Sequence, residues 1–238
     1  MNHVPSPDIR MDYSMNPYQG CEHGCVYCYA RNTHAYHDMG TGIEFESKII
    51  AKMNTAELLR DYINRTSWNA SPIMLSGNTD CYQPIERKYE LTHCALKVFL
   101  EAKHPVGIIT KNALILRDLP ILRSLAELGL IQVVISITTA NESLRAVMEP
   151  RTSTYHKKKQ LITLLSEEGI PVSVMMAPII PGLNDHEIMH IARETAQSGA
   201  RSFHYATVRL NGDVETIFKD WIYQFYPDRA QKVLNGIA

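Results

Sequence analysis

The sequence predicts an α/β protein built on a largely parallel β-sheet, and two patterns support this fold class. Short apolar runs recur along the chain and are apolar throughout rather than at every second residue, which is typical of strands covered by helices on both faces. Helical patterns with recognisable start and stop residues lie between these runs. Alternating strands and helices form right-handed βαβ units, so we expect a parallel sheet that is either open or closed into a barrel.

The strands are expected where the apolar runs are densest. Each of these runs is interpreted as a strand buried on both faces, and they cover residues 73–75, 106–110, 131–137, 171–177 and 202–208. A further strand is expected near the N-terminus, in residues 11–17, where the pattern is weaker.

The helices between these strands are predicted from their end signals. Asp118 is expected to cap one helix, with Pro120 in its first turn, because proline is tolerated there. Asn184 and Glu187 have the spacing of a capping box at the start of another. Thr92 is expected to begin a third helix. Three of the predicted helices end at glycines, which favour the left-handed backbone of a helix end: Gly129, Gly169 and Gly199.

The 238 residues contain no long Gly/Ser/Pro linker, so we expect a single domain over residues 1–238, with a helical extension from about residue 213 that packs through Trp221. No apolar run reaches the about 18 residues that a membrane span needs, and the N-terminus lacks the pattern of a signal peptide. A cytoplasmic protein without a membrane partner is expected.

The charges are balanced, with 24 Lys+Arg against 25 Asp+Glu and a formal net charge of −1. Proteins dedicated to nucleic acids usually carry a basic excess, because neutralised phosphates provide most of their non-specific affinity. Nucleic acid as a partner is therefore not supported by net charge. The basic run His156–Lys159 is interpreted as a solvated helix face.

Three of the five cysteines, Cys21, Cys25 and Cys28, lie within eight residues. Such clustering in a reducing compartment indicates a metal centre rather than a disulfide framework. Cys81 and Cys94 stand apart and are interpreted as ordinary buried residues.

The ligand count leaves two kinds of metal centre open. A structural zinc ion prefers four protein ligands, of which a histidine (His23, His34 or His37) could be the fourth. A four-iron cluster is normally held by four cysteines. Three cysteines leave one iron without a protein ligand, which is useful only if another molecule must bind there.

The segment from Gly20 to Tyr29 contains the pattern CxxxCxΦC, with aromatic Tyr27 just before the third cysteine. This pattern resembles the signature of the radical S-adenosylmethionine superfamily. The wider segment 16–31 looks like the branch related to spore photoproduct lyase, a family of DNA repair enzymes, and segments 76–80 and 177–182 also resemble family elements. The resemblance therefore extends over nearly the whole chain.

The resemblance implies a fold and a reaction. The fold is a partial (β/α)6 TIM-like barrel, with a cluster loop at residues 20–31. Cys21, Cys25 and Cys28 are expected to hold a [4Fe-4S] cluster, and S-adenosylmethionine is expected to bind the open iron. An electron from a donor such as flavodoxin or ferredoxin then cleaves this cofactor to a 5′-deoxyadenosyl radical, which abstracts hydrogen from an unidentified substrate. By analogy with spore photoproduct lyase, the resemblance also implies a lyase-like reaction on a nucleic-acid-related substrate.

The resemblance also implies residues that bind S-adenosylmethionine. The loop after the second barrel strand is expected to hold the amino group of the cofactor, Lys111 and Arg151 its carboxylate, and Ser136 its ribose or methionine part. The full expected set is Tyr27, Ser76, Gly77, Asn78, Thr79, Lys111, Ser136 and Arg151. From the residues alone, an ordinary strand-to-helix turn, surface ion pairs and satisfied core groups remain alternatives.

One departure from spore photoproduct lyases concerns their cysteine hydrogen donor. The corresponding place holds Ser76, and Cys81 lies five residues later, so the donor is either absent or relocated to Cys81. A second function class also stays open at this point: a non-catalytic zinc or iron–sulfur module that carries electrons.

Overall fold

A computed structural model describes residues 1–4 and 12–237 of the chain. Its nine strands within these ranges are β1 Asn2–His3, β2 Tyr13–Met15, β3 Tyr18–Gln19, β4 Ile50–Ala51, β5 Ile73–Leu75, β6 Val106–Thr110, β7 Ile131–Ser136, β8 Val172–Ile179 and β9 Ser202–Thr207. The main sheet has seven strands in the order β1-β2-β5-β6-β7-β8-β9. β2 and the five strands that follow it in this order are all parallel, and β1 joins the sheet antiparallel to β2.

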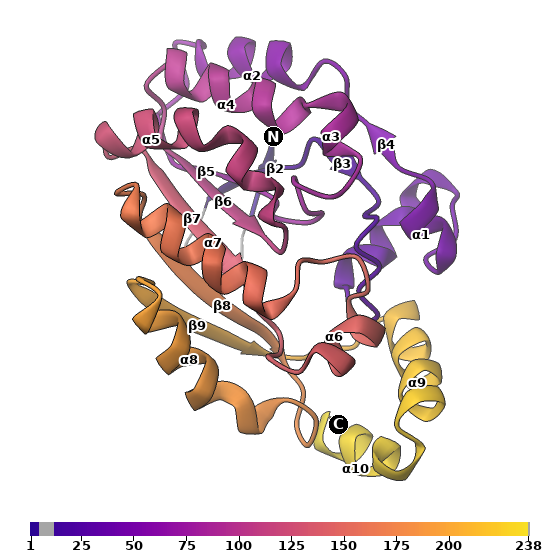
Figure 1. Cartoon of the computed structure of the whole chain (residues 1–238). Helices are drawn as coiled ribbons and strands as arrows, with labels where there is room; N and C mark the ends of the chain where they lie inside the picture. The colour runs from indigo at the N-terminus through magenta and orange to yellow at the C-terminus, as the bar shows by residue number, and fades with distance from the viewer. Residues whose placement is uncertain (5–11, 238) are drawn as a thin grey trace.

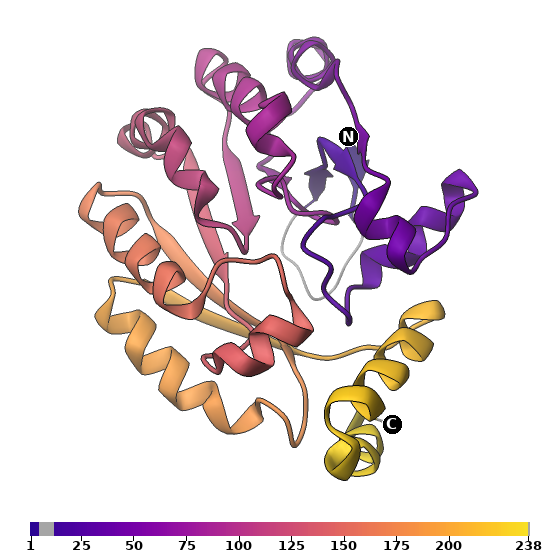
Figure 2. The same cartoon turned by 45° about the vertical axis from the view of Figure 1, so that its right-hand side comes forward.

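This sheet confirms the predicted α/β class, and its six parallel strands curve into a partial barrel (Figure 2). Each observed strand that corresponds to a predicted run begins and ends within two residues of that run. The predicted N-terminal strand corresponds to β2, and Met11 at its expected start lies outside the described residues.

Helices cover the outer side of the sheet, as expected for βαβ units (Figure 1). The α-helices are α1 Ile43–Ser47, α2 Thr55–Ile63, α3 Glu86–Tyr89, α4 Leu91–Glu101, α5 Leu119–Glu127, α6 Glu142–Met148, α7 Tyr155–Glu167, α8 Ile188–Gln197, α9 Asp213–Phe225 and α10 Pro227–Ile237. The 3-10 helices are η1 Tyr29–His37, η2 Ala113–Asp118 and η3 Asp185–Glu187. No helix among the described residues is long and apolar enough to span a membrane.

The main hydrophobic core lies between the sheet and these outer helices. Alternate residues of each strand, such as Val133 and Ile135 of β7, are fully buried in it. The residues between them face the inside of the barrel, and Ser136 at the end of β7 is one of these. Because the strands are parallel, their carboxyl ends meet at one edge, where ligand groups of barrel proteins gather.

Strand β9 differs from the prediction that every strand is buried on both faces. Five of its six residues are exposed and only Phe203 is partly buried. The reason is its position, because β9 is the last strand of the sheet and pairs with β8 alone. Apolar composition predicted the strand but not its place at the edge.

Asp118 and Asn184 stand at the N-cap positions of α5 and η3, near the predicted helix starts, but neither side chain forms the expected cap bond. The Asp118 side chain makes no cap bond to α5 and is buried, accepting hydrogen bonds from Tyr82 at 2.8 Å and from Arg117 at 3.0 Å. The Asn184 side chain accepts from the backbone of Ile180 at 2.6 Å. These polar groups are buried, so they take part in tertiary bonds instead of capping the adjacent helices.

Glu187, the other half of the predicted capping box, accepts hydrogen bonds from the Thr139 hydroxyl at 2.8 Å and the Ala140 backbone at 2.6 Å. Asn184 donates to the Thr138 carbonyl at 2.8 Å. The two residues therefore hold the loop after β8 against the loop after β7. Both loops lie at the carboxyl edge of the sheet.

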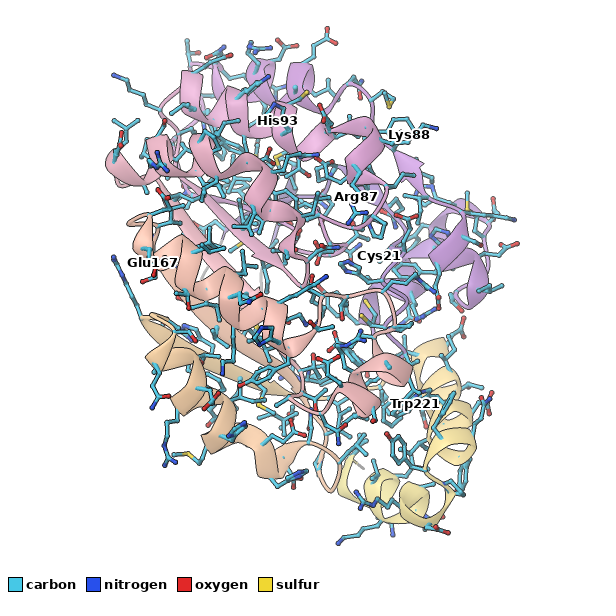
Figure 3. All side chains as sticks on the ribbon, in the orientation of Figure 1. Cys21, Arg87, Lys88, His93, Glu167 and Trp221 are labelled. Carbon is cyan, nitrogen blue, oxygen red and sulfur yellow. The ribbon has the colours of Figure 1, made fainter. Side chains whose placement is uncertain are left out.

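The C-terminal helices α9 and α10 pack against the cysteine loop and α6. Cys25, Tyr27 and Met148 share a hydrophobic cluster with residues of α9 and α10. The buried Trp221 of α9 donates from its indole nitrogen to the Val147 carbonyl at 2.9 Å, so α9 lies beside α6 (Figure 3). Tyr223, two residues further along, is half exposed.

Candidate active site

The three clustered cysteines lie in a loop between β3 and η1, close to the carboxyl end of β2. Cys21 and Cys25 are buried, and Cys28 is partly buried. Burial raises the pKa of all three thiols, to about 12 for Cys25. Cys28 packs against two hydrophobic clusters, one that contains Cys21 and one that contains Cys25. The loop gathers three thiols in a low-dielectric environment, where a positively charged metal centre would favour their deprotonation.

No group of three or more His, Cys, Asp or Glu side chains within residues 1–4 and 12–237 is arranged around the position of a single metal ion. Of the remaining cysteines, Cys81 is buried as predicted, whereas Cys94 is exposed on α4, contrary to the expectation. Cys81 packs in the main core, and its backbone is held by Ser76 and Thr92.

Two arginines and one glutamate fasten the cysteine loop to α1. The buried Arg31 donates to the Cys25 carbonyl at 2.9 Å and to the Glu46 carboxylate at 2.5 Å. Arg151 binds the same carboxylate and donates to the Glu22 carbonyl. Glu46 therefore joins both guanidinium groups across the loop. We call Arg31, Glu46 and Arg151 the arginine clamp.

Gly24 makes room for this clamp. It has a φ of +68°, and a Cβ atom at this position would overlap the Arg151 guanidinium and the Glu46 carboxylate. Gly24 thus meets two requirements at once, a left-handed backbone and close approach of neighbouring side chains.

Asp80 ties the inner side of the loop to the sheet. Its carboxylate accepts from the Thr110 hydroxyl and the Lys111 backbone, both at 2.8 Å, and lies 3.4 Å from His23 Nδ1. Burial alone would raise the pKa of Asp80, but His23 and these hydrogen bonds lower it. The cysteine loop is consequently connected to the ends of β5 and β6.

Behind the cysteines, a buried network centres on Glu149. Its Oε2 accepts from the Tyr27 hydroxyl at 3.1 Å and lies 3.2 Å from Lys111 Nζ. Lys111 Nζ also donates to Ser136 at 2.8 Å and Thr138 at 3.0 Å. Oε1 of Glu149 has no hydrogen-bond partner among the described residues. Burial alone would raise the pKa of Glu149, but Lys111 and other cations hold it down to about 2.

The structure brings Tyr27, Lys111 and Ser136 together, as the sequence predicted, but in unexpected roles. All three N–H donors of the Lys111 ammonium already have acceptors in Ser136, Thr138 and Glu149. A carboxylate ligand could bind Lys111 only by replacing one of them.

Arg151 is placed differently from the prediction. It belongs to the arginine clamp on the outer side of the cysteine loop, with 45% of its side chain exposed, and its donors bind Glu22 and Glu46. It does not join the network around Lys111. Glu149 is buried whereas Arg151 is largely exposed, and their separation of two residues in the sequence did not indicate this change.

The predicted loop 76–79 follows β5 directly and packs beside the start of the cysteine segment. The Asn16 side chain accepts from the backbones of Asn78 at 2.8 Å and Thr79 at 3.2 Å. Ser76 has a φ of +74°, and its hydroxyl accepts from the Cys81 backbone. The Gly77 carbonyl accepts from the Tyr29 hydroxyl at 2.5 Å. The loop therefore lies next to the cysteines, but these interactions occupy several of its polar groups.

The basic run at the start of α7 is not a solvated face throughout, which corrects the prediction. Lys157 is exposed, but Lys158 is 2% exposed. Lys158 shares a helix face with the buried Leu161, Ile162 and Leu165. This spacing was the available signal that Lys158 points inward.

A comparison with models of known protein families agrees with the fold. The family model described as Radical SAM superfamily matches residues 15–195. The chain therefore belongs to the radical SAM superfamily and is an enzyme of that class, and the family implies a [4Fe-4S] cluster and S-adenosylmethionine as cofactors.

Similar proteins occur in distant organisms. Rv2578c of Mycobacterium tuberculosis is 31% identical over 235 residues, which cover 98% of this chain and 69% of the relative. MJ0683 of Methanocaldococcus jannaschii is 29% identical, over 95% of this chain and 81% of the relative.

Among solved structures, a spore photoproduct lyase C140A mutant with dinucleoside spore photoproduct is similar in fold, with a TM-score of 0.70 and 17% identity. The match covers 95% of this chain and 63% of the lyase, so this chain spans less than two thirds of that structure. The fold matches the branch that the sequence resembles.

Proposed function

We propose that Cys21, Cys25 and Cys28 hold a [4Fe-4S] cluster whose fourth iron binds S-adenosylmethionine. The observation that carries the proposal is the buried cysteine loop, fastened by the arginine clamp and Asp80 at the carboxyl end of the barrel. When bound, such a cluster supplies one electron that splits S-adenosylmethionine into methionine and a 5′-deoxyadenosyl radical able to abstract hydrogen from a substrate.

The donor set fits this cluster. Three thiols lie on one short loop, where Cys28 packs against the clusters that contain Cys21 and Cys25. The two other cysteines lie on different elements, Cys81 in the core after β5 and Cys94 exposed on α4. Thiolates are the usual ligands of iron–sulfur clusters. The clamp holds the loop in place, so little of the binding energy of the cluster would be spent on ordering the loop.

For the cofactor we propose contacts with the loop 76–79, Tyr27, Lys111 and Ser136. The loop lies beside the cysteine segment, and its Gly77 packs so closely against Ser14 that a Cβ atom would overlap that side chain. Lys111 would bind a carboxylate by exchanging it for Glu149, because its donors are otherwise engaged. Arg151 is omitted, since the arginine clamp holds it on the outer side.

The substrate class remains a proposal by analogy. The similar lyase structure contains a dinucleoside photoproduct, so a nucleic-acid-related substrate and a lyase-like reaction are the first to test. The formal net charge of −1 gives no general affinity for phosphates. A small nucleotide lesion or a modified base is therefore favoured over long duplex binding. An acidic protein such as flavodoxin or ferredoxin is proposed as the electron donor.

The proposal is tested by iron content and by cofactor cleavage. Anaerobically reconstituted protein should be brown with about four irons per chain, and after reduction it should convert S-adenosylmethionine slowly to 5′-deoxyadenosine. Cys25→Ala should abolish both properties, whereas Cys94→Ala should retain them. Colourless protein with one tightly bound zinc would support the non-catalytic module instead. A reduced four-iron cluster that produces no 5′-deoxyadenosine would support an electron carrier.

A further inference from the structure

Four polar side chains on three neighbouring strands are joined by hydrogen bonds, and the proposed function does not use them. Gln132 Nε2 of β7 donates to Ser173 Oγ of β8 at 2.8 Å. The hydroxyl oxygens of Ser173 and of Ser202 on β9 lie 2.6 Å apart, and Ser202 Oγ lies 3.1 Å from His204 Nε2. We call Gln132, Ser173, Ser202 and His204 the polar row.

The polar row faces the inside of the barrel. Val174 of β8 is buried in the main core, and Phe203 of β9 packs against this core. Because successive residues of a strand point to opposite faces, Ser173, Ser202 and His204 point inward. All members of the row except Ser173 are exposed, so the row reaches solvent instead of being sealed in a core.

Strand register places His204 on the same stretch of wall as the proposed cofactor contacts. Ser136 at the end of β7 pairs with Met175 of β8, which in turn pairs with His204. Lys111 Nζ donates to Ser136 at 2.8 Å. Because neighbouring strands are separated by about 4.8 Å, the Cα atoms of Ser136 and His204 are about 10 Å apart. A substrate in contact with His204 would therefore lie beside a cofactor in contact with Lys111 and Ser136.

The hydrogen bonds of the row leave one donor of His204 open. The Gln132 amide nitrogen is a donor, so the Ser173 hydroxyl accepts from it. Both hydroxyl protons of the row have an acceptor if Ser173 donates to Ser202 and Ser202 donates to His204 Nε2. The proton of the neutral imidazole is then on Nδ1, which has no hydrogen-bond partner among the described residues. The row thus ends in an N–H group on the inner wall.

We propose that His204 donates from Nδ1 to the substrate, and that Ser173 and Ser202 position the imidazole for this bond. The inference rests on the proposed function and names the part of the substrate that is recognised. The polar row contains no lysine, arginine or carboxylate, so it has no counter-ion for a phosphate or an ammonium group. The carbonyl oxygens and ring nitrogens at the edge of a nucleobase are neutral acceptors. The recognised group is therefore the base of a nucleoside and not its phosphate.

The test is equilibrium dialysis of the four deoxynucleosides against the anaerobically reconstituted protein with saturating S-adenosylmethionine. At least one nucleoside should bind, and 2-deoxyribose, which has no base, should not. His204→Phe keeps a flat ring without the donor and should weaken binding about tenfold, which corresponds to about 1.4 kcal/mol. Tyr205→Phe is the matched control, because it removes one hydroxyl from an exposed ring on the opposite face of the same strand. Its affinity should equal that of the wild type.

Two further variants separate the donor from the residues that position it. His204→Asn keeps an N–H donor near the place of Nδ1 and should recover most of the affinity. Ser202→Ala should weaken binding less than His204→Phe, and it should move the imidazole proton toward Nε2, which ¹⁵N nuclear magnetic resonance of histidine-labelled protein detects.

Equal affinities of the wild type and His204→Phe, including no binding by either, would overturn the role of His204. Iron analysis of the same samples tests the proposed function separately. A wild type that assembles no four-iron cluster but binds a nucleoside through His204 would overturn the proposed function and support the role of His204.

Discussion

Glu149 is fully buried and yet remains a carboxylate, because it lies 3.2 Å from the Lys111 ammonium. The Tyr27 hydroxyl donates to the same oxygen. Removing one partner of a buried ion pair leaves an uncompensated charge and is strongly destabilising. The pair therefore fixes Tyr27 beside the cysteines and makes the stability of the site depend on pH.

The sign of this pH dependence follows from the lowered pKa of Glu149, about 2 against 4.5 in the unfolded chain. A depressed pKa stabilises the fold above pH 4.5, and the contribution is lost as pH falls toward 2. We expect the free energy of unfolding to fall about 2 kcal/mol more between pH 5 and pH 3 in the wild type than in Glu149→Gln. Urea titrations of the metal-free protein at both pH values measure this, and parallel losses would contradict it.

Gly24 and Gly129 allow a matched test of the space beneath the arginine clamp. Both have a left-handed backbone, with φ of +68° and +70°, but only Gly24 has neighbours that a Cβ would meet. Gly129→Ala should cost only the backbone strain, roughly 1–2 kcal/mol. Gly24→Ala should cost more and should also release iron faster to a chelator. Equal effects on stability and on iron release would show that the clamp does not need Gly24.

From the sequence alone, site residues could be assigned where they lie close together along the chain. Cys21, Cys25 and Cys28 could be grouped because a short loop brings them together whatever the rest of the fold does. Glu46 and Glu149 could not be assigned, since their partners lie on other elements and only the folded chain joins them.

Among the elements, the cysteine loop is held in place by α1. Glu46 on α1 joins Arg31 to Arg151 across the loop, whereas Glu44 on the same helix forms an exposed pair with Lys48 at 2.5 Å. The difference between the two glutamates is burial of the partner, because Arg31 is 1% exposed.

These two glutamates provide a second matched pair. Glu46→Gln should destabilise the fold on the order of 2 kcal/mol, as expected for a lost charge-assisted bond, and should raise the rate of iron loss several-fold. Glu44→Gln should change little, because exposed ion pairs contribute little. Stopped-flow chelation of iron from the reconstituted variants gives the rates. Identical rates of iron loss for the two variants would show that the arginine clamp does not hold the cysteine loop.

The elements themselves were largely predictable, whereas their ends and surroundings were not. Continuous apolar runs located β5, β6 and β7 because helices bury their outer faces and the barrel interior buries most residues of their inner faces. The same pattern in β9 was misleading, since its edge position depends on strand order rather than composition. Asp118 has the residue type of a cap, but the tertiary partners Tyr82 and His93 compete for its carboxylate.

At the scale of the whole molecule, the C-terminal helices complete the surroundings of the cysteine loop. In Figure 1 α9 lies near α1, on the side of the barrel where the loop lies, and α10 lies below it. Asp213 at the start of α9 accepts from Thr41 at 2.9 Å. The family match ends at residue 195, so these helices pack on the site from outside the matched region.

Trp221 tests this packing. Trp221 is 5% exposed and belongs to the hydrophobic cluster of side chains that includes Cys25, whereas Tyr223 on the same helix is 50% exposed. Trp221→Ala should destabilise the fold by about 3–5 kcal/mol and shorten the lifetime of the bound iron. Tyr223→Ala should stay within about 0.5 kcal/mol of the wild type. If Trp221→Ala changed neither the thermal unfolding nor the iron retention, α9 would not support the cysteine loop.

In the proposed function, three cysteines leave one iron of the cluster open for S-adenosylmethionine. The most direct measurement is the electron paramagnetic resonance spectrum of the reduced, reconstituted protein with and without saturating S-adenosylmethionine. We expect a [4Fe-4S]1+ signal whose g values shift when the cofactor is added, because the cofactor would become a ligand of the open iron. A signal that saturating cofactor leaves unchanged would contradict the proposed function.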